Sequence, residues 1–376
     1  MKELLYVSFV DFADAQQWGV TKKILTQIKV FEAAGFHATC ITLQGNSIVR
    51  MCGEETICMR ECKQGVRARI ALLDSFKKYL KDNSVDICYI RYQFSDPFFV
   101  SALRKLSAKG VRIIIEIATY PYEPALRMQG VGGRIKICCD QMFRGYMKKS
   151  VERFVTYSKD ERILGVKAIQ VINGLDLKMN PLRKPHEPDE CLVLLTVSSM
   201  KPWHGYDRLL KGMRNYYKDG GTRVILLYMV GDGPACAEYR TLVNEYHLSE
   251  KVVYCGFLQD KALDEMYEKS DIAISSLADH RAGVYTASPL KTAEYAVRGI
   301  PFVTAYDVEG MEQGKHYMRV PPDDTPIDIF KIVAFINKIN EVGKNSAEIA
   351  QEIHNAAIDC YGMEKTHIPV LQHLIS

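Results

Sequence analysis

The stretch ASPLKTAEYAVRGIP, residues 287–301, predicts a short helix whose two ends are both specified by the sequence. Ser288 is a good N-cap, and Pro289 suits the first helical position, where its missing N–H costs nothing. Gly299 suits the left-handed position after the last turn, and Pro301 prevents the helix from continuing. Both ends therefore agree with a short helix.

The start of this predicted helix is a candidate anion site. The free amides of Leu290 and Lys291 lie at the positive end of the helix dipole, and Lys291 adds a full charge. Glu294 follows one turn later on the same face, where its carboxylate could accept hydrogen bonds from sugar hydroxyls. A phosphate beside a diol is the outline of a nucleotide sugar. An ordinary capped surface helix is the alternative interpretation of the same residues.

The composition indicates a folded globular protein. The chain has 376 residues, which is enough for two domains, and it is 47% hydrophobic and 25% charged. A net charge of +4 is too small to argue for nucleic-acid binding. The 11 cysteines form no CxxC pair or regular framework, so we expect free thiols and a cytoplasmic location.

Neither a membrane-spanning segment nor a metal site is predicted. The N-terminal residues run directly into a strand pattern rather than a signal peptide. No apolar run approaches the ~20 residues that a membrane-spanning helix needs. We find no clustered Asp-x-Asp and no His/Cys set with ligand spacing, so no metal is expected.

The first half of the chain opens with a βαβ pattern, which predicts a parallel sheet. A strand over 4–10 is followed by a polar loop, a helix over 20–34 and a strand over 37–43. Gly19 lies in the loop after the first strand, where α/β sheets place ligands, and is a candidate ligand-binding residue. The loop lacks the GxGxxG spacing, which argues against a nicotinamide enzyme.

A strand over 112–117 leads into a Pro- and Tyr-rich loop with two carboxylates, Glu116 and Glu123. Tyr120 could stack on a sugar face, and Glu123 could hold hydroxyls or polarise an acceptor. Because the loop follows a strand, we favour a pocket wall over a structural turn fixed by prolines.

Residues 134–154 have helical periodicity and an excess of Lys and Arg interleaved with bulky apolar residues. Such a helix could lie on an anionic membrane surface. An amphipathic core helix with a solvated basic face is the more common alternative, and both interpretations remain open.

The second half begins after a Pro-rich linker at 181–190 and repeats the strand–loop–helix order. Four loops therefore share the carboxyl edge of one predicted sheet. Their candidate ligand-binding residues are Ser199, Lys201 and His204 in the first loop, Gly231 and Gly233 in the second, Phe257 in the third, and Ser288 with Leu290 in the fourth. His204 could act as a neutral hydrogen-bond donor or as a cation near its ordinary pKa of about 6.5, or it could only satisfy a loop carbonyl.

At these loops the second half resembles the nucleotide-sugar domain of GT-B glycosyltransferases, particularly the retaining family 4, also called the group 1 transferases. The resemblance rests on Val197–Met200, His204-Gly205, Leu209-Leu210, Val230–Pro234, Gly256-Phe257, Glu294 and Gly299–Pro301. The first half resembles the acceptor domain, including residues 173–176. The resemblance implies an α/β fold with two Rossmann-like domains facing across a cleft. These would span 1–180, completed by a C-terminal helix at 361–376, and 190–360.

The resemblance implies a metal-independent enzyme that moves a sugar from a nucleotide diphosphate donor to a hydroxyl acceptor with retention. The nucleotide sugar is a co-substrate, and no other cofactor is implied. Glu294 would bind the donor ribose, Lys291 and the helix start would bind the phosphates, and His204 with Lys201 would close on them. Glu123 and Tyr120 would shape the sugar or acceptor side, and Gly19 would let the first loop approach the donor. We expect a saccharide or lipid-linked saccharide acceptor of a bacterial surface polymer.

Three positions depart from the family pattern. Ser198-Ser199 replaces the usual Gly-Arg, His204 replaces a Lys, and Thr286 stands where the first of two paired glutamates is expected. Lys291, Lys201, Arg281 and the amides at 289–291 are the candidates that would meet the diphosphate charge instead. These departures leave two alternatives open: a non-catalytic GT-B-like subunit that binds a partner enzyme or glycan, and another GT-B enzyme such as a nucleotide-sugar epimerase.

Overall fold

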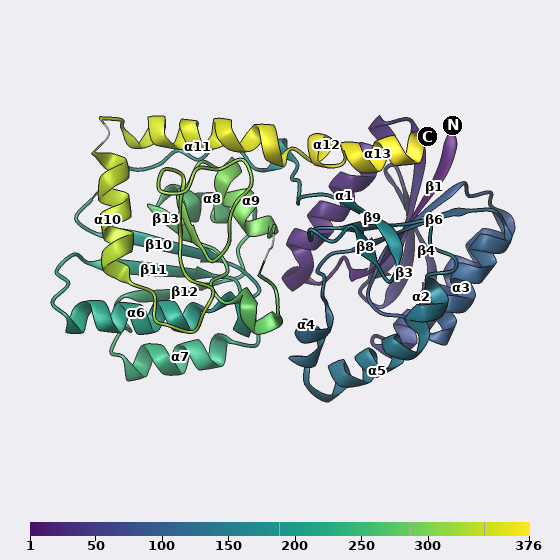
Figure 1. Cartoon of the computed structure of the whole chain (residues 1–376), viewed down its shortest axis with the longest axis horizontal. Helices are drawn as coiled ribbons and strands as arrows, with labels where there is room; N and C mark the ends of the chain where they lie inside the picture. The colour runs from purple at the N-terminus through teal and green to yellow at the C-terminus, as the bar shows by residue number, and fades with distance from the viewer. Residues whose placement is uncertain (188, 286–287, 342) are drawn as a thin grey trace. The chain divides into compact units, whose positions relative to one another are not determined.

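The structure is a computed structural model that describes the whole chain except residues 188, 286–287 and 342. The chain divides into two compact units (Figure 1). Unit 1 comprises Met1–Ile172 and Thr366–Ser376, and unit 2 comprises Asn173–Lys365.

Unit 1 is built on a nine-stranded sheet with the order β4-β3-β2-β1-β5-β6-β7-β9-β8. Its strands are β1 (Lys2–Asp11), β2 (Phe36–Gln44), β3 (Ser47–Cys52), β4 (Glu55–Glu61), β5 (Ile87–Arg91), β6 (Arg112–Ile117), β7 (Arg153–Thr156), β8 (Arg162–Ile163) and β9 (Val166–Gln170). Its helices are α1 (Trp18–Ala33), α2 (Val66–Asp82), α3 (Pro97–Ala108), α4 (Glu123–Arg127), α5 (Gly130–Met147) and α13 (Ile368–Ile375), with a short 3₁₀ turn, η1 (Ala15–Gln17). The six central strands, in the order β2-β1-β5-β6-β7-β9, pair in parallel. Strands β3 and β4 at one edge and β8 at the other pair in the antiparallel sense.

Unit 2 is built on a six-stranded sheet with the order β12-β11-β10-β13-β14-β15, in which every neighbouring pair is parallel. Its strands are β10 (Leu192–Val197), β11 (Ile225–Val230), β12 (Val252–Gly256), β13 (Ile272–Ile274), β14 (Phe302–Thr304) and β15 (Tyr317–Arg319). Its helices are α6 (Tyr206–Lys218), α7 (Cys236–Glu245), α8 (Asp260–Glu268), α9 (Leu290–Val297), α10 (Ile329–Asn340) and α11 (Ser346–Tyr361). Short turns are η2 (Leu177–Met179), η3 (Pro202–His204) and η4 (Asp279–Ala282), and α12 (Met363–Thr366) spans the unit boundary.

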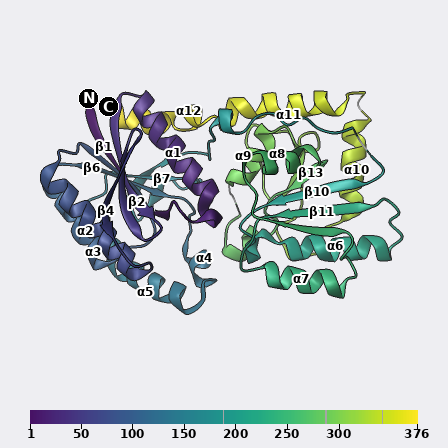
Figure 2. The same cartoon turned by 180° about the vertical axis from the view of Figure 1, so that it is seen from behind.

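Each sheet is covered by helices on both faces, which is the Rossmann-like arrangement that the sequence predicts. In unit 2, α6 and α7 lie on one face and α8, α9 and α11 on the other, as the views from front and back agree (Figures 1 and 2). In unit 1, one buried cluster packs the sheet against α2 and α3, and another packs it against α1 and α13. The predicted α/β class with two parallel sheets is confirmed.

The last segment of the chain completes unit 1. Val370 and Leu374 of α13 are fully buried beside Leu4 and Tyr6 of β1. Arg112 of β6 donates hydrogen bonds to the carbonyl oxygens of two residues at the end of α13. The sheet of unit 1 therefore depends on residues at both ends of the sequence.

The Glu116 carboxylate is fully buried and does not line a pocket wall, in contrast to the prediction for this loop. It accepts hydrogen bonds from Gln27 Nε2 at 2.6 Å and Tyr89 OH at 2.7 Å, and pairs with Lys23 and Arg91. Although burial alone would raise the pKa of this carboxyl, Lys23 and Arg91 hold it well below its usual range. The penultimate position of β6 points Glu116 inward, which a strand-end motif alone does not reveal.

Candidate functional site

Helix α9 begins one residue later than the sequence predicts. Its N-cap is Pro289, with no side-chain cap, so the prediction that Ser288 caps the helix is wrong. The Ser288 hydroxyl instead accepts a hydrogen bond from the Asn173 amide at 3.1 Å, and Asn173 Nδ2 donates to the Ser288 carbonyl. The first intrahelical bond is donated by Thr292, so the amides of the two preceding residues are left at the helix start. Gly299 has a φ of 73° and ends the helix as predicted.

Lys291 places a buried ammonium group at this helix start. Its Nζ is buried and has no hydrogen-bond partner within the described part of the chain. It lies 5.8 Å from the ring centroid of Tyr206. Burial lowers the pKa of Lys291, and the nearby Asp279 carboxylate counteracts this only in part. An ammonium without a hydrogen-bond acceptor is costly to bury. Lys291 thus brings a positive charge to the start of α9, beside its two free amides.

Asp279 is the buried acidic group that faces Lys291, and sequence reasoning missed it. Burial raises the pKa of Asp279, while Lys291 and a hydrogen bond from Ser276 oppose the change. Asp279 begins η4, in the loop before α9, but nothing in the local sequence distinguishes it from a surface aspartate. Only the folded loop brings it beside the ammonium group.

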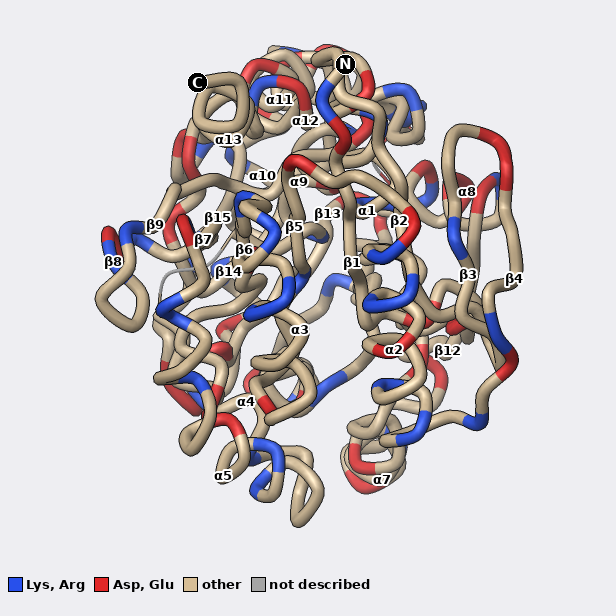
Figure 3. The backbone as a smooth tube through the Cα atoms, turned by 90° about the vertical axis from the view of Figure 1, so that its right-hand side faces the viewer, with Lys and Arg blue, Asp and Glu red and all other residues tan. Residues whose placement is uncertain are grey.

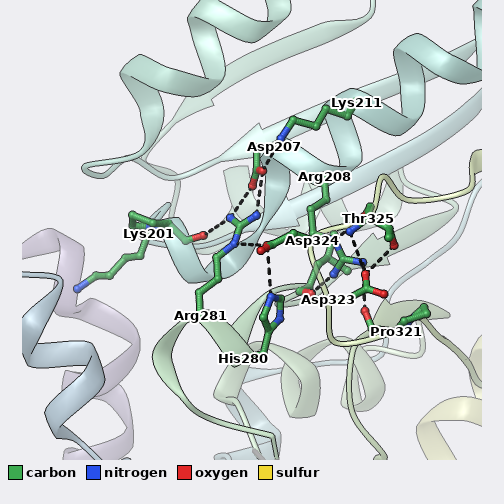
Figure 4. Close-up of polar contacts among 12 residues, drawn as sticks. Lys201, Asp207, Arg208, Lys211, His280, Arg281, Pro321, Asp323, Asp324 and Thr325 are labelled. Atoms are coloured by element: carbon green, nitrogen blue, oxygen red, sulfur yellow. Dashed lines mark hydrogen bonds and ion pairs between the residues drawn. The ribbon is translucent and has the colours of Figure 1, made fainter.

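A network of ion pairs fixes this loop (Figure 4). Arg281 donates to both carboxylate oxygens of Asp207 at 2.8 and 3.0 Å, to Asp324 at 2.7 Å and to the Pro202 carbonyl at 3.0 Å. Although burial raises the pKa of Asp207, the bonds from Arg281 and Lys211 hold it below its usual range. Because these contacts use four of its five N–H donors, Arg281 holds the loop in place, and its predicted contact with phosphate stays a prediction.

Arg208 extends the same network from α6, and its side chain is fully buried (Figure 4). It donates to the carbonyl oxygens of Thr325 at 2.7 Å and Pro321 at 3.1 Å, and to the Asp323 carboxylate at 3.0 Å. It also donates to the Leu277 carbonyl, just ahead of η4. The loop that carries Asp279 is thus held from two sides.

His204 lies in the same cluster as a neutral side chain. Burial, together with the positive charges of Lys291 and Lys201, lowers its pKa well below the ordinary value. The Lys201 amide donates to His204 Nδ1 at 3.2 Å, which leaves the proton of the neutral ring on Nε2. Of the two predicted states, the structure therefore favours the neutral hydrogen-bond donor. The Lys201 ammonium itself lies 5.3 Å from the Trp203 ring centroid.

Glu294 follows Lys291 by one turn of α9. Its Oε1 atom is buried and accepts no hydrogen bond from the described residues. Arg298 Nε lies 3.5 Å from this oxygen, and the same guanidinium donates to Asp264 at 2.6 Å and lies 4.4 Å from the Tyr267 ring centroid. Arg298 thus places a positive charge beside the Glu294 carboxylate, and the Oε1 atom keeps acceptor capacity.

The glycines after β11 let two loops of unit 2 pack closely together. A Cβ atom on Gly231 would lie 1.9 Å from the Ser198 carbonyl oxygen, and one on Gly233 would lie 2.0 Å from that of Ser199. Their predicted approach to a ligand stays a prediction. Their packing fixes the loop that carries Lys201 and His204.

The remaining candidates are spread over both units. In unit 2, Phe257 follows β12 with 42% of its surface exposed. In unit 1, α1 begins at Trp18, two residues before the predicted start, so the prediction that Gly19 lies in a loop is wrong. No atom of the described residues lies within 4 Å of a Cβ built on Gly19. Tyr120 is half-buried beside Tyr122, and the Glu123 carboxylate accepts a hydrogen bond from Arg144 Nη1 at 2.5 Å. The Thr286 position lies outside the described residues.

Helix α5 ends at Met147, so the prediction of one helix over 134–154 is wrong at its end, and Arg153 already begins β7. Exposed apolar side chains occur along α5 at Val131, Ile135, Met142 and Tyr146. Lys and Arg residues lie along the same helix (Figure 3). A cavity of about 510 Å³ between α3 and α5 is lined by Phe143, Tyr146, Arg104 and Lys105 among others.

The described residues carry neither a recognisable metal site nor a membrane span. They contain no group of three His, Cys, Asp or Glu side chains arranged to hold a metal ion. Among the same residues, every helix is too short or too polar to cross a bilayer.

Comparison with solved structures defines the class of protein. Sucrose-phosphate synthase from Thermosynechococcus elongatus aligns with a TM-score of 0.65 at 14% identity, covering 100% of this chain and 99% of that chain. HepE from Anabaena, in complex with UDP-glucose, aligns with a TM-score of 0.61 at 11% identity and the same coverages. WaaG, a glycosyltransferase involved in lipopolysaccharide biosynthesis, aligns with a TM-score of 0.64 at 12% identity, covering 99% of each chain. The fold is that of the GT-B glycosyltransferases.

A family model matches part of unit 2. Residues 180–316 match the family described as glycosyl transferases group 1. It contains β10 to β14 with all four loops discussed above. The search of curated proteins gave no match. The predicted resemblance is thus confirmed at the level of the fold, and residues 180–316 match the group 1 family model.

Proposed function

We propose that the protein transfers a sugar from a nucleotide diphosphate donor to a hydroxyl group of a saccharide acceptor, with retention at the anomeric carbon. The observation that carries this proposal is the Lys291 ammonium, buried at the start of α9 with no hydrogen-bond acceptor in the described chain. A donor diphosphate supplies the missing acceptor. The family of unit 2 and the UDP-glucose bound to the structurally similar HepE support a nucleotide sugar.

The donor would be held by α9 and the loop after β10. The Lys291 ammonium and the amides at the helix start bind the diphosphate, and His204 Nε2–H adds a neutral donor nearby. Glu294 Oε1 accepts hydrogen bonds from the ribose diol, while Arg298 neutralises the carboxylate from behind. The exposed ring of Phe257 offers a flat surface to the base.

The chemical step follows from these positions. As the bond between sugar and diphosphate breaks, negative charge grows on the departing oxygen and the sugar becomes cation-like. A buried ammonium and fixed amides stabilise that charge more strongly than water does, because they need no reorganisation. No metal ion is required in this scheme, since Lys291 supplies the positive charge.

The acceptor side is proposed to lie in unit 1. Tyr120 offers a ring for stacking on a sugar, and Glu123, oriented by Arg144, offers an acceptor for hydroxyl protons. The exposed apolar and basic residues of α5 suit contact with an anionic membrane surface at the cytoplasmic side, where a lipid-linked saccharide would be presented. Synthesis of a bacterial surface polysaccharide or glycoconjugate is the corresponding role.

Nucleotide binding tests the proposal directly. The protein is heated with UDP, GDP, ADP and dTDP in separate thermal-shift experiments. A ligand at 100 times its dissociation constant should add about 2.7 kcal/mol to the unfolding free energy. No shift with any nucleotide would refute donor binding. A shift without sugar transfer from any nucleotide sugar would instead favour a non-catalytic subunit.

Three further measurements test the finer claims. The anomeric configuration of the product, followed by NMR, distinguishes retention from inversion. Activity that survives EDTA supports metal independence. Flotation with liposomes that contain or lack anionic lipid tests α5, and absence of binding to both would leave α5 as an ordinary surface helix.

A further inference from the structure

A second cluster of reactive side chains lies in unit 1, on three neighbouring strands. Glu3 of β1 places Oε2 2.7 Å from Nδ1 of His37 on β2. On the other side of the same ring, Nε2 lies 3.2 Å from Sγ of Cys52 on β3. A carboxylate, an imidazole and a thiol thus stand in line, each within hydrogen-bond reach of the next.

The register of the sheet creates this alignment. Glu3 pairs directly with His37 in the parallel β1–β2 ladder. Cys52 pairs with Thr39 in the antiparallel β2–β3 ladder, and Thr39 is two residues from His37 and therefore on the same face. All three side chains consequently share one face of the sheet.

Within unit 1, the cluster lies at the opposite edge of the sheet from the residues proposed for ligand binding. Glu3 and His37 lie at the amino ends of β1 and β2, whereas Gly19 and the loop with Tyr120 follow the carboxyl ends of strands in this sheet. The side chains of His37 and Glu3 are 45% and 37% exposed, and Cys52 is partly exposed. A small molecule from solution can therefore reach the thiol.

We propose that Cys52 is the nucleophile of a thiol–disulfide exchange site that takes low-molecular-weight disulfides. Sγ of Cys52 attacks one sulfur of the disulfide, and the thiol proton passes to Nε2 of His37. A new bond forms between Cys52 and that sulfur as the old S–S bond breaks. The departing thiolate takes the proton from His37, so electrons and protons balance without a further reactant.

Glu3 and His37 are the positioning and base groups of this step. The carboxylate fixes the ring with Nε2 toward the sulfur and stabilises the imidazolium that forms. The backbone amide of Glu3 is itself held by Asp86 Oδ2 at 2.7 Å. With Glu3 and Asp86 nearby, a neutral or cationic disulfide is favoured over an anionic one.

The other cysteines provide an internal comparison. Cys58 and Cys138 are exposed, and neither has a histidine hydrogen bond among the described residues. Cys40 and Cys88 are buried, and burial raises the pKa of both thiols. Exposure alone therefore predicts Cys58 and Cys138 as the fastest thiols, whereas the cluster predicts Cys52.

The experiment measures cysteine-resolved rates with cystamine, a cationic disulfide, by peptide mass spectrometry of the full-length native protein. Cys52 should be modified at least about 3-fold faster than Cys58 and Cys138. Its rate should fall to theirs in His37→Gln and fall in part in Glu3→Gln, with the other two thiols unchanged. Glu55→Gln is the matched control, because Glu55 is a nearby carboxylate that pairs with Arg50 at 3.0 Å.

Two outcomes would overturn the proposal. One is a native Cys52 that reacts no faster than Cys58, and the other is a rate at Cys52 that His37→Gln leaves unchanged. The unfolding midpoint of each variant verifies that it is folded, and Glu3→Gln retains a hydrogen-bonding side chain if His37→Gln fails this check. In denaturant all three thiols should react alike, and a Cys52 that remains fastest there would also refute the cluster as the cause.

Discussion

Lys291 is the residue at which stability and ligand binding oppose each other. Its ammonium is buried, and no described residue accepts a hydrogen bond from it, so Lys291→Met removes a desolvated charge and keeps most of the volume. We expect the unfolding free energy to change by less than about 1 kcal/mol, because Asp279, whose pKa burial raises, can take up a proton. Affinity for UDP-glucose or the best nucleotide sugar should fall roughly 10- to 100-fold.

Calorimetry of both unfolding and nucleotide binding measures the two effects. Lys211→Met is the matched control, since Lys211 is 40% exposed and pairs with Asp207 on the far side of the network. Its loss should leave nucleotide affinity unchanged. Equal affinity of Lys291→Met and the native protein would place the phosphate elsewhere.

The same residue predicts how binding depends on pH. Burial lowers the pKa of Lys291 to about 7, so the ammonium is present below that pH and lost above it. Because a diphosphate favours the ammonium, binding should take up a proton, and affinity should fall as the pH rises through this range. Asp279 acts in the same direction, since its ionisation opposes an incoming anion. His204 contributes nothing, because its pKa lies well below.

Titration calorimetry with a nucleotide sugar in buffers of different ionisation enthalpy counts the protons taken up. The phosphates of a nucleotide sugar keep a constant charge across this range, so they do not obscure the count. Lys291→Met should remove most of the uptake. Affinity that rises with pH would contradict the assignment.

At this scale, sequence reasoning finds residues whose role depends on local spacing and misses those that depend on folding. Lys291 and Glu294 are three residues apart on α9, so their spacing in the sequence already places them near each other. Asp279 meets Lys291 only after the network at Arg281 and Arg208 has fixed its loop. Ser288 has the composition of an N-cap, but Asn173, far away in sequence, takes its hydroxyl instead.

At the scale of elements, the glycine after β11 is a test of loop packing. Gly231 has a φ of 108°, and an added Cβ would lie 1.9 Å from the Ser198 carbonyl oxygen. Gly256 after β12 has a φ of 67° with no atom within 4 Å of the same position. Gly256→Ala should cost about 1 kcal/mol of stability, whereas Gly231→Ala should cost more than about 3 kcal/mol.

Denaturant titration of the two variants separates steric clash from backbone strain. Gly231→Ala should also weaken nucleotide binding, because the displaced loop carries Lys201 and His204. If the two variants lose the same free energy of unfolding, the contact between a Cβ at position 231 and the Ser198 carbonyl does not destabilise the protein.

Most elements follow from periodicity, and the exceptions have local causes. The antiparallel hairpin of β3 and β4 is absent from the prediction, because β4 is an edge strand exposed along most of its length and lacks an apolar alternation. The helix expected over 134–154 stops at Met147, since the apolar residues after it are the buried positions of β7. A run of alternating polar and apolar residues does not by itself mark where a helix gives way to a strand.

At the scale of the whole molecule, the resemblance to GT-B glycosyltransferases implies two Rossmann-like domains with a returning C-terminal segment. The division in the structure falls after Ile172, and the returning segment begins at Thr366. The predicted linker at 181–190 lies inside unit 2, where buried Arg183 donates to the Ser270 carbonyl at 2.5 Å. A proline-rich composition indicates an irregular segment, but only its contacts assign it to one unit.

The returning segment should stabilise unit 1 alone. Val370 and Leu374 are fully buried against β1, so Leu374→Ala should destabilise unit 1 by about 2–5 kcal/mol and Val370→Ala by somewhat less.

The two tryptophans allow a measurement for each unit, because Trp18 lies in α1 of unit 1 and Trp203 in η3 of unit 2. Fluorescence of Trp203→Phe variants then follows unit 1, and that of Trp18→Phe variants follows unit 2. Gln372→Ala, an exposed change on the same helix, is the control and should shift neither transition. If Leu374→Ala shifts the unfolding midpoints of both units equally, the two units unfold together. The C-terminal segment would then stabilise unit 2 as well as unit 1.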